Sequence, residues 1–207
     1  MPGFVSHISF GTLLGGAAVV YLVTNAFLPL SLSLLVALAV AIGSFLPDAD
    51  SDTSLPYHIA LTILSCAVGI MTYFYFRPSI KDVVEIAWRV IVALAVVKFV
   101  IGPIIKKLTS HRGIWHSIPA AVIATLATFL LLQMIDLNMD ARLYIAMGLG
   151  AGYLFHLILD EGTSLLRFKF LIFWSPKQSL GSALKFIGES KTITIIAYLI
   201  IIVLFVT

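Results

Sequence analysis

Cysteine is almost absent from this chain of 207 residues, in which Cys66 stands alone. A single cysteine cannot form an intrachain disulfide and cannot build a zinc site rich in thiolates. Charge is scarce as well, since Asp, Glu, Lys and Arg make up 11% of the residues while hydrophobic residues make up 60%. That composition is too apolar for a soluble globular domain. A metal site here would therefore depend on histidine and carboxylate ligands in a membrane protein.

Other common signatures are missing too. The sequence has no glycine-rich phosphate loop and no GxSxG motif, which argues against a nucleotide enzyme and against a serine hydrolase. No Lys or Arg precedes the first apolar run and no small-residue cleavage site follows it, so we expect no removed signal peptide. The basic residues are spread around a membrane surface, and we expect no binding of nucleic acid.

Long apolar runs predict an all-α, polytopic transmembrane bundle, because a helix needs about 20 residues to cross a bilayer and helices satisfy their own backbone in lipid. Seven runs approach that length: 8–24, 30–47, 57–76, 83–105, 117–135, 141–160 and 191–206. The connections are too short for a second folded domain, so residues 1–207 are predicted to form one integral membrane domain. The connection 161–190 mixes aromatic with basic residues and is predicted to lie along the cytoplasmic interface as an amphipathic segment.

Counting these crossings puts all five histidines on one side of the bilayer. The loops 48–56 and 106–116 and the segment 161–190 would share a face with the N-terminus. That face carries Lys106, Lys107, Arg112, Arg167, Lys169, Lys177, Lys185 and Lys191, against Arg77, Lys81 and Arg142 on the other. Cytoplasmic loops are the ones enriched in Lys and Arg, so we expect the histidines to face the cytoplasm from the inner membrane.

Two pairs of polar residues lie at the ends of apolar runs. His156 and Asp160 are four residues apart in HLILD, a spacing that stacks both side chains on one helix face. Asp48 and Asp50 follow Pro47 in LPDAD, and alternating carboxylates in a turn can face one cation or bridge two. The other interpretations are a helix-terminal histidine beside a capping-region acid, and acids solvated in a loop.

The motif HRGIWHS supplies two more candidate ligands, His111 and His116. Gly113 between them permits a bend that would turn both inward, and Ser117 is the expected N-cap of the helix that follows. Arg112 carries a planar cation that suits phosphate or carboxylate. Pairing of Arg112 with lipid headgroups is the alternative.

His7 opens the first apolar run and is followed by Gly11, Gly15 and Gly16. Such small residues let helices pack closely, which would bring His7 near the other polar groups. An isolated interfacial histidine is the alternative for His7. The remaining histidine, His58, fits an ordinary helix start.

These motifs resemble the YdjM-like family of membrane-bound, LexA-regulated predicted metal-dependent hydrolases. The matching pieces are VSH at 5–7, LPDAD at 46–50, HRGIWHS at 111–117 and HLILD at 156–160. The resemblance implies metal binding by His7, Asp48, Asp50, His111, His116, His156 and Asp160. That family is remotely similar to zinc-dependent phospholipase C and the P1-type nucleases, helical enzymes whose zinc cluster cleaves phosphate esters. Those enzymes are secreted and also use their N-terminal amine, a pattern from which this multi-spanning chain departs.

The predicted function is therefore a membrane-bound hydrolase that holds a divalent metal, with one to three zinc ions expected. Such ions activate water and stabilise the anion that develops at phosphorus or carbonyl carbon. We expect Arg112 to bind the substrate's phosphate, and Asp52 or Glu161 to orient a ligand or relay a proton. A site at the headgroup level favours a lipid-linked phosphate ester as substrate, with membrane lipids as partners. The competing hypothesis is a transporter or metal-binding protein that uses the same ligands without turnover.

Overall fold

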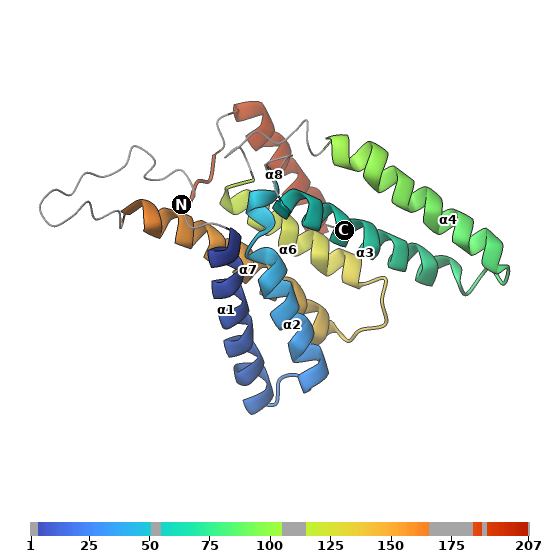
Figure 1. The fold of residues 1–207 in the computed structure, drawn as a ribbon, viewed down its shortest axis with the longest axis horizontal. Coiled ribbons are helices and arrows are strands. Elements are labelled where there is room, and N and C mark those ends of the chain that lie inside the picture. Colours follow the sequence, from blue (N-terminus) through green and yellow to red (C-terminus); the bar gives the residue numbers. More distant parts are fainter. Residues whose placement is uncertain (1–3, 51–54, 105–114, 166–183, 188–189, 207) are drawn as a thin grey trace, which may run out of the picture.

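The computed structural model describes residues 4–50, 55–104, 115–165, 184–187 and 190–206, and within these residues the chain is helical (Figure 1). The long helices are α1 (Phe4–Thr24), α2 (Leu30–Gly43), α3 (Leu55–Phe76), α4 (Val83–Val96), α6 (Ile118–Leu132), α7 (Met139–Leu165) and α8 (Lys191–Val206). Between α2 and α3 in sequence lies a short 3-10 helix, η1 (Leu46–Asp50), and α4 continues into a π-helical turn, η2 (Val97–Ile101). The predicted all-α class is confirmed for the described residues.

The prediction of seven membrane crossings is not supported. Three described helices are long and apolar enough to cross a membrane by length and composition: α1, residues Tyr57–Phe76 of α3 and residues Met139–Gly162 of α7. The apolar helices α2, α6 and α8 have 14, 15 and 16 residues, fewer than a straight crossing needs. α4 carries Glu85 and Arg89 within its 14 residues before the π-helical turn begins. Hydropathy counts an apolar run but does not register where the helix within it ends.

The second apolar run illustrates this difference. The run predicted over 30–47 forms a regular helix only to Gly43, and the chain then turns into η1 with Pro47 inside it. Proline lacks a backbone N–H and cannot continue the helical ladder. The turn places Asp48 beyond the end of α2 rather than on its face.

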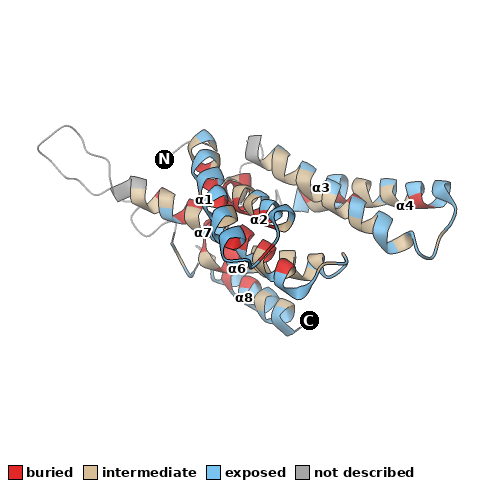
Figure 2. Ribbon diagram, turned by 90° about the horizontal axis from the view of Figure 1, so that it is seen from below, coloured by how far each residue is buried: buried red, intermediate tan, exposed pale blue. Residues whose placement is uncertain are grey.

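Close packing of α1, α2 and α7 forms the core. A Cβ atom on Gly11 would overlap the Ser44 side chain, and one on Gly15 would lie 2.9 Å from the Ala37 carbonyl oxygen of α2. The predicted close approach at these two glycines is confirmed, whereas Gly16 has nothing within 4 Å of its Cβ position. Val36 and Val40 of α2 pack with buried residues of α7 in this core, and Figure 2 shows the buried residues gathered where these helices meet α6.

The antiparallel pair of α3 and α4 projects away from that core (Figures 1 and 2). Only 6% of the apolar window in Tyr57–Phe76 is buried. Large side chains such as Phe74, Trp88 and Phe99 are exposed along the pair. A lipid environment satisfies such a surface, since lipid tails are as apolar as the side chains that they contact.

The predicted interfacial segment 161–190 is described only at its edges, and residues 166–183 lie outside the described part. At the edge that is described, the Ile118 backbone N–H donates to the Lys185 carbonyl at 3.1 Å. This contact attaches residues near the start of α8 to the start of α6, which α8 also packs against.

Candidate metal centre

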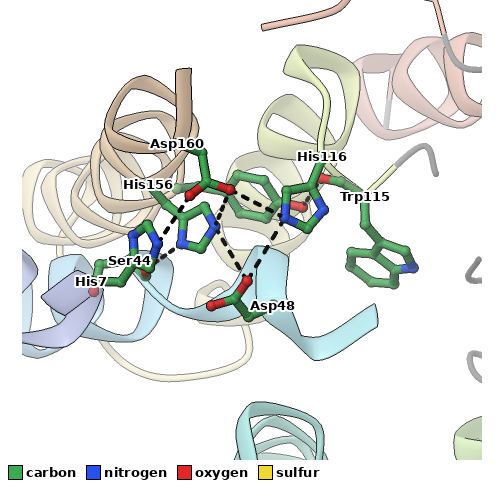
Figure 3. Close-up of polar contacts among 8 residues, drawn as sticks. His7, Ser44, Asp48, Trp115, His116, His156 and Asp160 are labelled. Atoms are coloured by element: carbon green, nitrogen blue, oxygen red, sulfur yellow. Dashed lines mark hydrogen bonds and ion pairs between the residues drawn. The ribbon is translucent and has the colours of Figure 1, made fainter. Parts of the chain in front are cut away.

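Five of the predicted ligands meet at one end of the packed helices (Figure 3). His7 comes from the first turn of α1, Asp48 from η1, and His116 from the residues just before α6. His156 and Asp160 come from α7, one helical turn apart on one face. The helix ends thus gather side chains that are up to 153 positions apart in the sequence.

Local structure fixes the position of His116. Ser117 is the N-cap of α6, its hydroxyl accepts a hydrogen bond from the Ala120 backbone N–H at 3.4 Å, and Pro119 lies in the first turn. This N-cap was predicted from sequence and is confirmed. Because the helix starts at residue 118, His116 lies just before α6, and its side chain faces Asp48 of η1 and Asp160 of α7.

Four ligand atoms from two histidines and two aspartates lie close together, with each imidazole nitrogen facing one oxygen of each carboxylate. The Nε2 atom of His116 lies 3.8 Å from Asp48 Oδ1 and 3.9 Å from Asp160 Oδ2. The Nε2 atom of His156 lies 3.6 Å and 3.7 Å from the same two oxygens. Ligand atoms around a tetrahedral zinc ion, at metal–ligand distances of about 2.0–2.1 Å, are about 3.4 Å apart. The four His–carboxylate distances exceed that spacing by about 0.2–0.5 Å. The ligand atoms of Asp48, His116 and His156 are close enough together to hold one ion.

The fifth side chain, His7, lies beside the other carboxylate oxygen of Asp160. His7 Nε2 lies 3.2 Å from Asp160 Oδ1. Its ring stacks on that of His156, with centroids 3.8 Å apart and planes 21° apart. His7, His156 and Asp160 form a second group whose ligand atoms are close enough for one ion. This group and the group of Asp48, His116 and His156 share His156, so they are parts of one continuous cluster.

Burial makes an uncompensated charge in this cluster costly in free energy. His7, His116, His156 and Asp160 are each less than 5% exposed, whereas the Asp48 side chain is 31% exposed. Two carboxylates with neutral imidazoles would carry two negative charges, which are costly to bury without compensation. Either protonated imidazoles or a divalent cation can balance them. The exposed edge at Asp48 is the side from which the cluster can be reached.

The pKa of Asp48 reflects these neighbours. Burial raises the pKa of its carboxyl group, but the adjacent His116, His156 and His7 outweigh burial. The net pKa of Asp48 lies below the ordinary aspartate value. Asp48 is therefore held as a carboxylate, the form that binds metal.

Comparison with known proteins shows the family of the chain. A family model described as YdjM inner membrane protein matches residues 1–207. The chain belongs to the YdjM inner membrane protein family. Searches of curated proteins and of solved structures found no match. The family description and the three apolar helices together indicate an inner membrane protein.

In this YdjM-family chain, the orientation of His156 is set by a backbone group that sequence reasoning missed. His156 Nδ1 lies 2.8 Å from the Ser44 carbonyl oxygen at the end of α2. A carbonyl oxygen only accepts, so Nδ1 carries the hydrogen and the lone pair of Nε2 faces the cluster. Nε2 is buried and has no hydrogen-bond partner within the described residues. A metal-ligating histidine typically donates its other N–H to such an acceptor.

Two glycines make the Ser44 contact possible. A Cβ atom on Gly43 would overlap the Leu149 carbonyl oxygen of α7, and one on Gly152 would overlap the Val40 carbonyl oxygen of α2. The two helices therefore cross backbone to backbone at this point. Small residues in both helices were the available sequence signal, although the sequence does not say which helices they join.

The remaining predicted residues are placed as follows. Glu161 follows Asp160 on α7 and is half-buried. One residue along a helix turns the side chain by about 100°, so Glu161 leaves α7 from a different face than Asp160. Asp52, His111 and Arg112 lie outside the described residues, as does the side chain of Asp50.

Proposed function

We propose that this YdjM-family protein is a membrane-bound, metal-dependent hydrolase whose centre is built by Asp48, His116, His156 and Asp160. The observation that carries the proposal is the meeting of these four buried or half-buried side chains, with His–carboxylate distances of 3.6 to 3.9 Å. Two imidazole nitrogens and two carboxylate oxygens are a donor set that suits zinc. The pre-set tautomer of His156 supports the same assignment.

Each residue has a role that follows from its surroundings. His156 is fixed by Ser44 and presents Nε2, while Asp160 directs Oδ2 to the centre and Oδ1 to His7. Asp48 closes the accessible edge, where a substrate would enter. When bound, zinc would supply Lewis acidity that makes water more acidic and stabilises a developing oxyanion. We propose one ion among the four donors, with His7 beside them.

The substrate that we propose is a phosphate ester of a lipid or lipid-linked molecule. The cluster lies where α1 and α6 begin and where α2 ends, which is a location at the end of the apolar helices rather than at their midpoints. Such a location matches the headgroup level of a bilayer better than the midplane, where transporter sites commonly lie. Lys and Arg are enriched in the sequence just before His116 and after Asp160, which supports a cytoplasmic orientation of the centre. In this proposal Arg112 binds the phosphate, and Asp52 or Glu161 assists as ligand partner or proton relay.

Metal content and turnover should be measured together on the purified full-length protein. His156→Ala and Asp160→Asn are expected to lose both zinc and hydrolysis of a phospholipid or a chromogenic phosphodiester, because the first removes a buried nitrogen ligand and the second removes a buried negative charge. Two matched controls are available in the chain. His58→Ala changes an exposed histidine of α3, and Asp140→Asn changes an acid in the first turn of α7, about 30 Å along the helix from Asp160.

The outcomes separate the competing functions. Zinc retained by the controls but lost from the two site variants, with hydrolysis following zinc, supports the hydrolase. Zinc flux into liposomes without hydrolysis of any ester would favour a transporter. Unchanged zinc content in the two site variants would contradict the metal centre itself.

A further inference from the structure

A second buried polar contact crosses between the elements that supply the donors. The Tyr153 side chain of α7 is completely buried, and its hydroxyl donates a hydrogen bond of 2.5 Å to the Trp115 carbonyl oxygen. Trp115 directly precedes His116 (Figure 3). The bond joins residues 38 positions apart, so it holds two segments together rather than closing a local turn.

The position of Tyr153 on α7 gives this bond its importance. Tyr153, His156 and Asp160 are spaced by three and four residues, which puts them on one face of the helix. The same face that presents two of the donors thus also holds the backbone beside a third donor, His116. Leu157 and the alanines at the start of α6 pack with Tyr153 in a small buried cluster, which keeps its ring in place.

His116 is the donor for which such a restraint matters most. Its Nε2 atom has the two longest distances of the four-donor centre, 3.8 and 3.9 Å, against 3.6 and 3.7 Å for His156. His156 has a direct backbone partner in Ser44 and lies within the regular part of a long helix. His116 comes from a non-helical approach to α6, so its distance to the α7 donors depends on what holds residues 115 and 116.

We propose that Tyr153 is a positioning residue of the metal centre. Its hydroxyl holds the Trp115 carbonyl and thereby sets the distance from His116 to His156 and Asp160. This inference rests on the proposed metal centre and adds a residue that touches neither the ion nor the substrate. Residues that orient metal ligands commonly contribute 10-fold to 100-fold to metal affinity, and we expect about 10-fold for this indirect contact.

The test compares Tyr153→Phe with Tyr57→Phe in the full-length protein. Tyr57 also donates its hydroxyl to a backbone carbonyl, that of Gly102 at 3.3 Å, but it joins α3 to the end of η2. Three quantities are measured for both variants: the zinc Kd by competition with a chelator, the visible absorption spectrum of the cobalt(II) form, and the unfolding midpoint of the metal-free protein. The spectrum reports ligand geometry directly, which a general loss of stability does not alter.

We expect Tyr153→Phe to weaken zinc binding about 10-fold and to shift the cobalt(II) spectrum, with the same number of ions bound at saturation. Tyr57→Phe should match the wild type in both readouts. Equal zinc affinity and an unchanged spectrum in Tyr153→Phe would overturn the inference while leaving the metal centre intact. Equal weakening in both variants, with unchanged spectra, would reduce Tyr153 to a stability role and also overturn it. A wild-type protein that binds no zinc or cobalt would instead refute the metal centre, and the role of Tyr153 with it.

Discussion

Replacement of Gly152 by alanine should damage the metal centre without changing any of its ligands. The new Cβ atom would overlap the Val40 carbonyl oxygen and lie 2.9 Å from the Val40 carbonyl carbon and 3.0 Å from the Ser44 backbone nitrogen. All three are backbone atoms that cannot rotate away. Because ordinary contact begins at 3.4 Å and the Val40 oxygen is the nearest of the three atoms, α2 and α7 must move apart by about 1 Å.

That separation acts on the Ser44 carbonyl, which accepts from His156 Nδ1 at 2.8 Å. Overpacking of this kind costs about 1–3 kcal/mol. A buried imidazole N–H that loses its acceptor costs about 1–3 kcal/mol more. Alanine returns about 1 kcal/mol through its better helix propensity. The net expectation is a loss of about 1–5 kcal/mol in the free energy of unfolding, together with a 10-fold to 100-fold weaker zinc affinity.

The matched control is Gly16→Ala, since that glycine is also in a helix but has nothing within 4 Å of its Cβ position. It should leave zinc affinity unchanged and stabilise the protein by about 0.5–1 kcal/mol. Unfolding in detergent and zinc competition measure both quantities for both variants. The reasoning would be refuted if Gly152→Ala bound zinc as tightly as Gly16→Ala and unfolded at the same midpoint.

Two further predictions concern the ion and pH. A chelator should lower the unfolding midpoint of the zinc-loaded wild type but not that of His156→Ala. An ion that binds only the folded state contributes about 2.7 kcal/mol to the free energy of unfolding when its concentration is 100 times its Kd. Equal responses of the two proteins would contradict the prediction. In the metal-free protein, the folded-state pKa of Asp48 lies below its ordinary value of 3.8. Its carboxylate therefore contributes stability above pH 3.8 that is lost as the pH falls through the folded-state pKa, and Asp48→Asn should unfold with a shallower dependence on pH in this acidic range. An identical acid dependence in both proteins would count against that assignment.

The meeting of the site residues could be predicted from the sequence to a large extent. His7, Asp48, His116 and the pair His156 and Asp160 lie at the ends of apolar runs, and the structure brings these ends together although seven alternating crossings are not supported. Polar side chains in apolar helices are costly in free energy unless they are paired, which is a physical reason for these polar groups to lie together. The i and i+4 spacing of the α7 pair also predicts that both side chains leave the helix from one face.

Other features could not be predicted, for physical reasons. The predicted number of crossings failed because α2 and α6 end before their apolar runs do, at turns such as η1, and because α8, which matches its run, has only 16 residues. The Ser44 contact uses a backbone carbonyl, and every residue has one, so no side-chain pattern reveals it. The sequence carried a signal for Tyr153, because it lies three residues before His156 on the same helix face. However, an aromatic residue in an apolar run normally indicates a residue of the hydrophobic core.

The two donors on α7 restrict the rotation of this helix about its own axis. A shift of α7 by a single residue would turn its side chains by about 100° and carry His156 and Asp160 away from Asp48 and His116 together. A bound ion would therefore oppose any turning or sliding of α7 against η1 and the start of α6. In a bilayer, apolar helices gain little from excluding water at their contacts. The bonds between the ion and its ligands would therefore fix the position of this end of α7 relative to η1 and the start of α6.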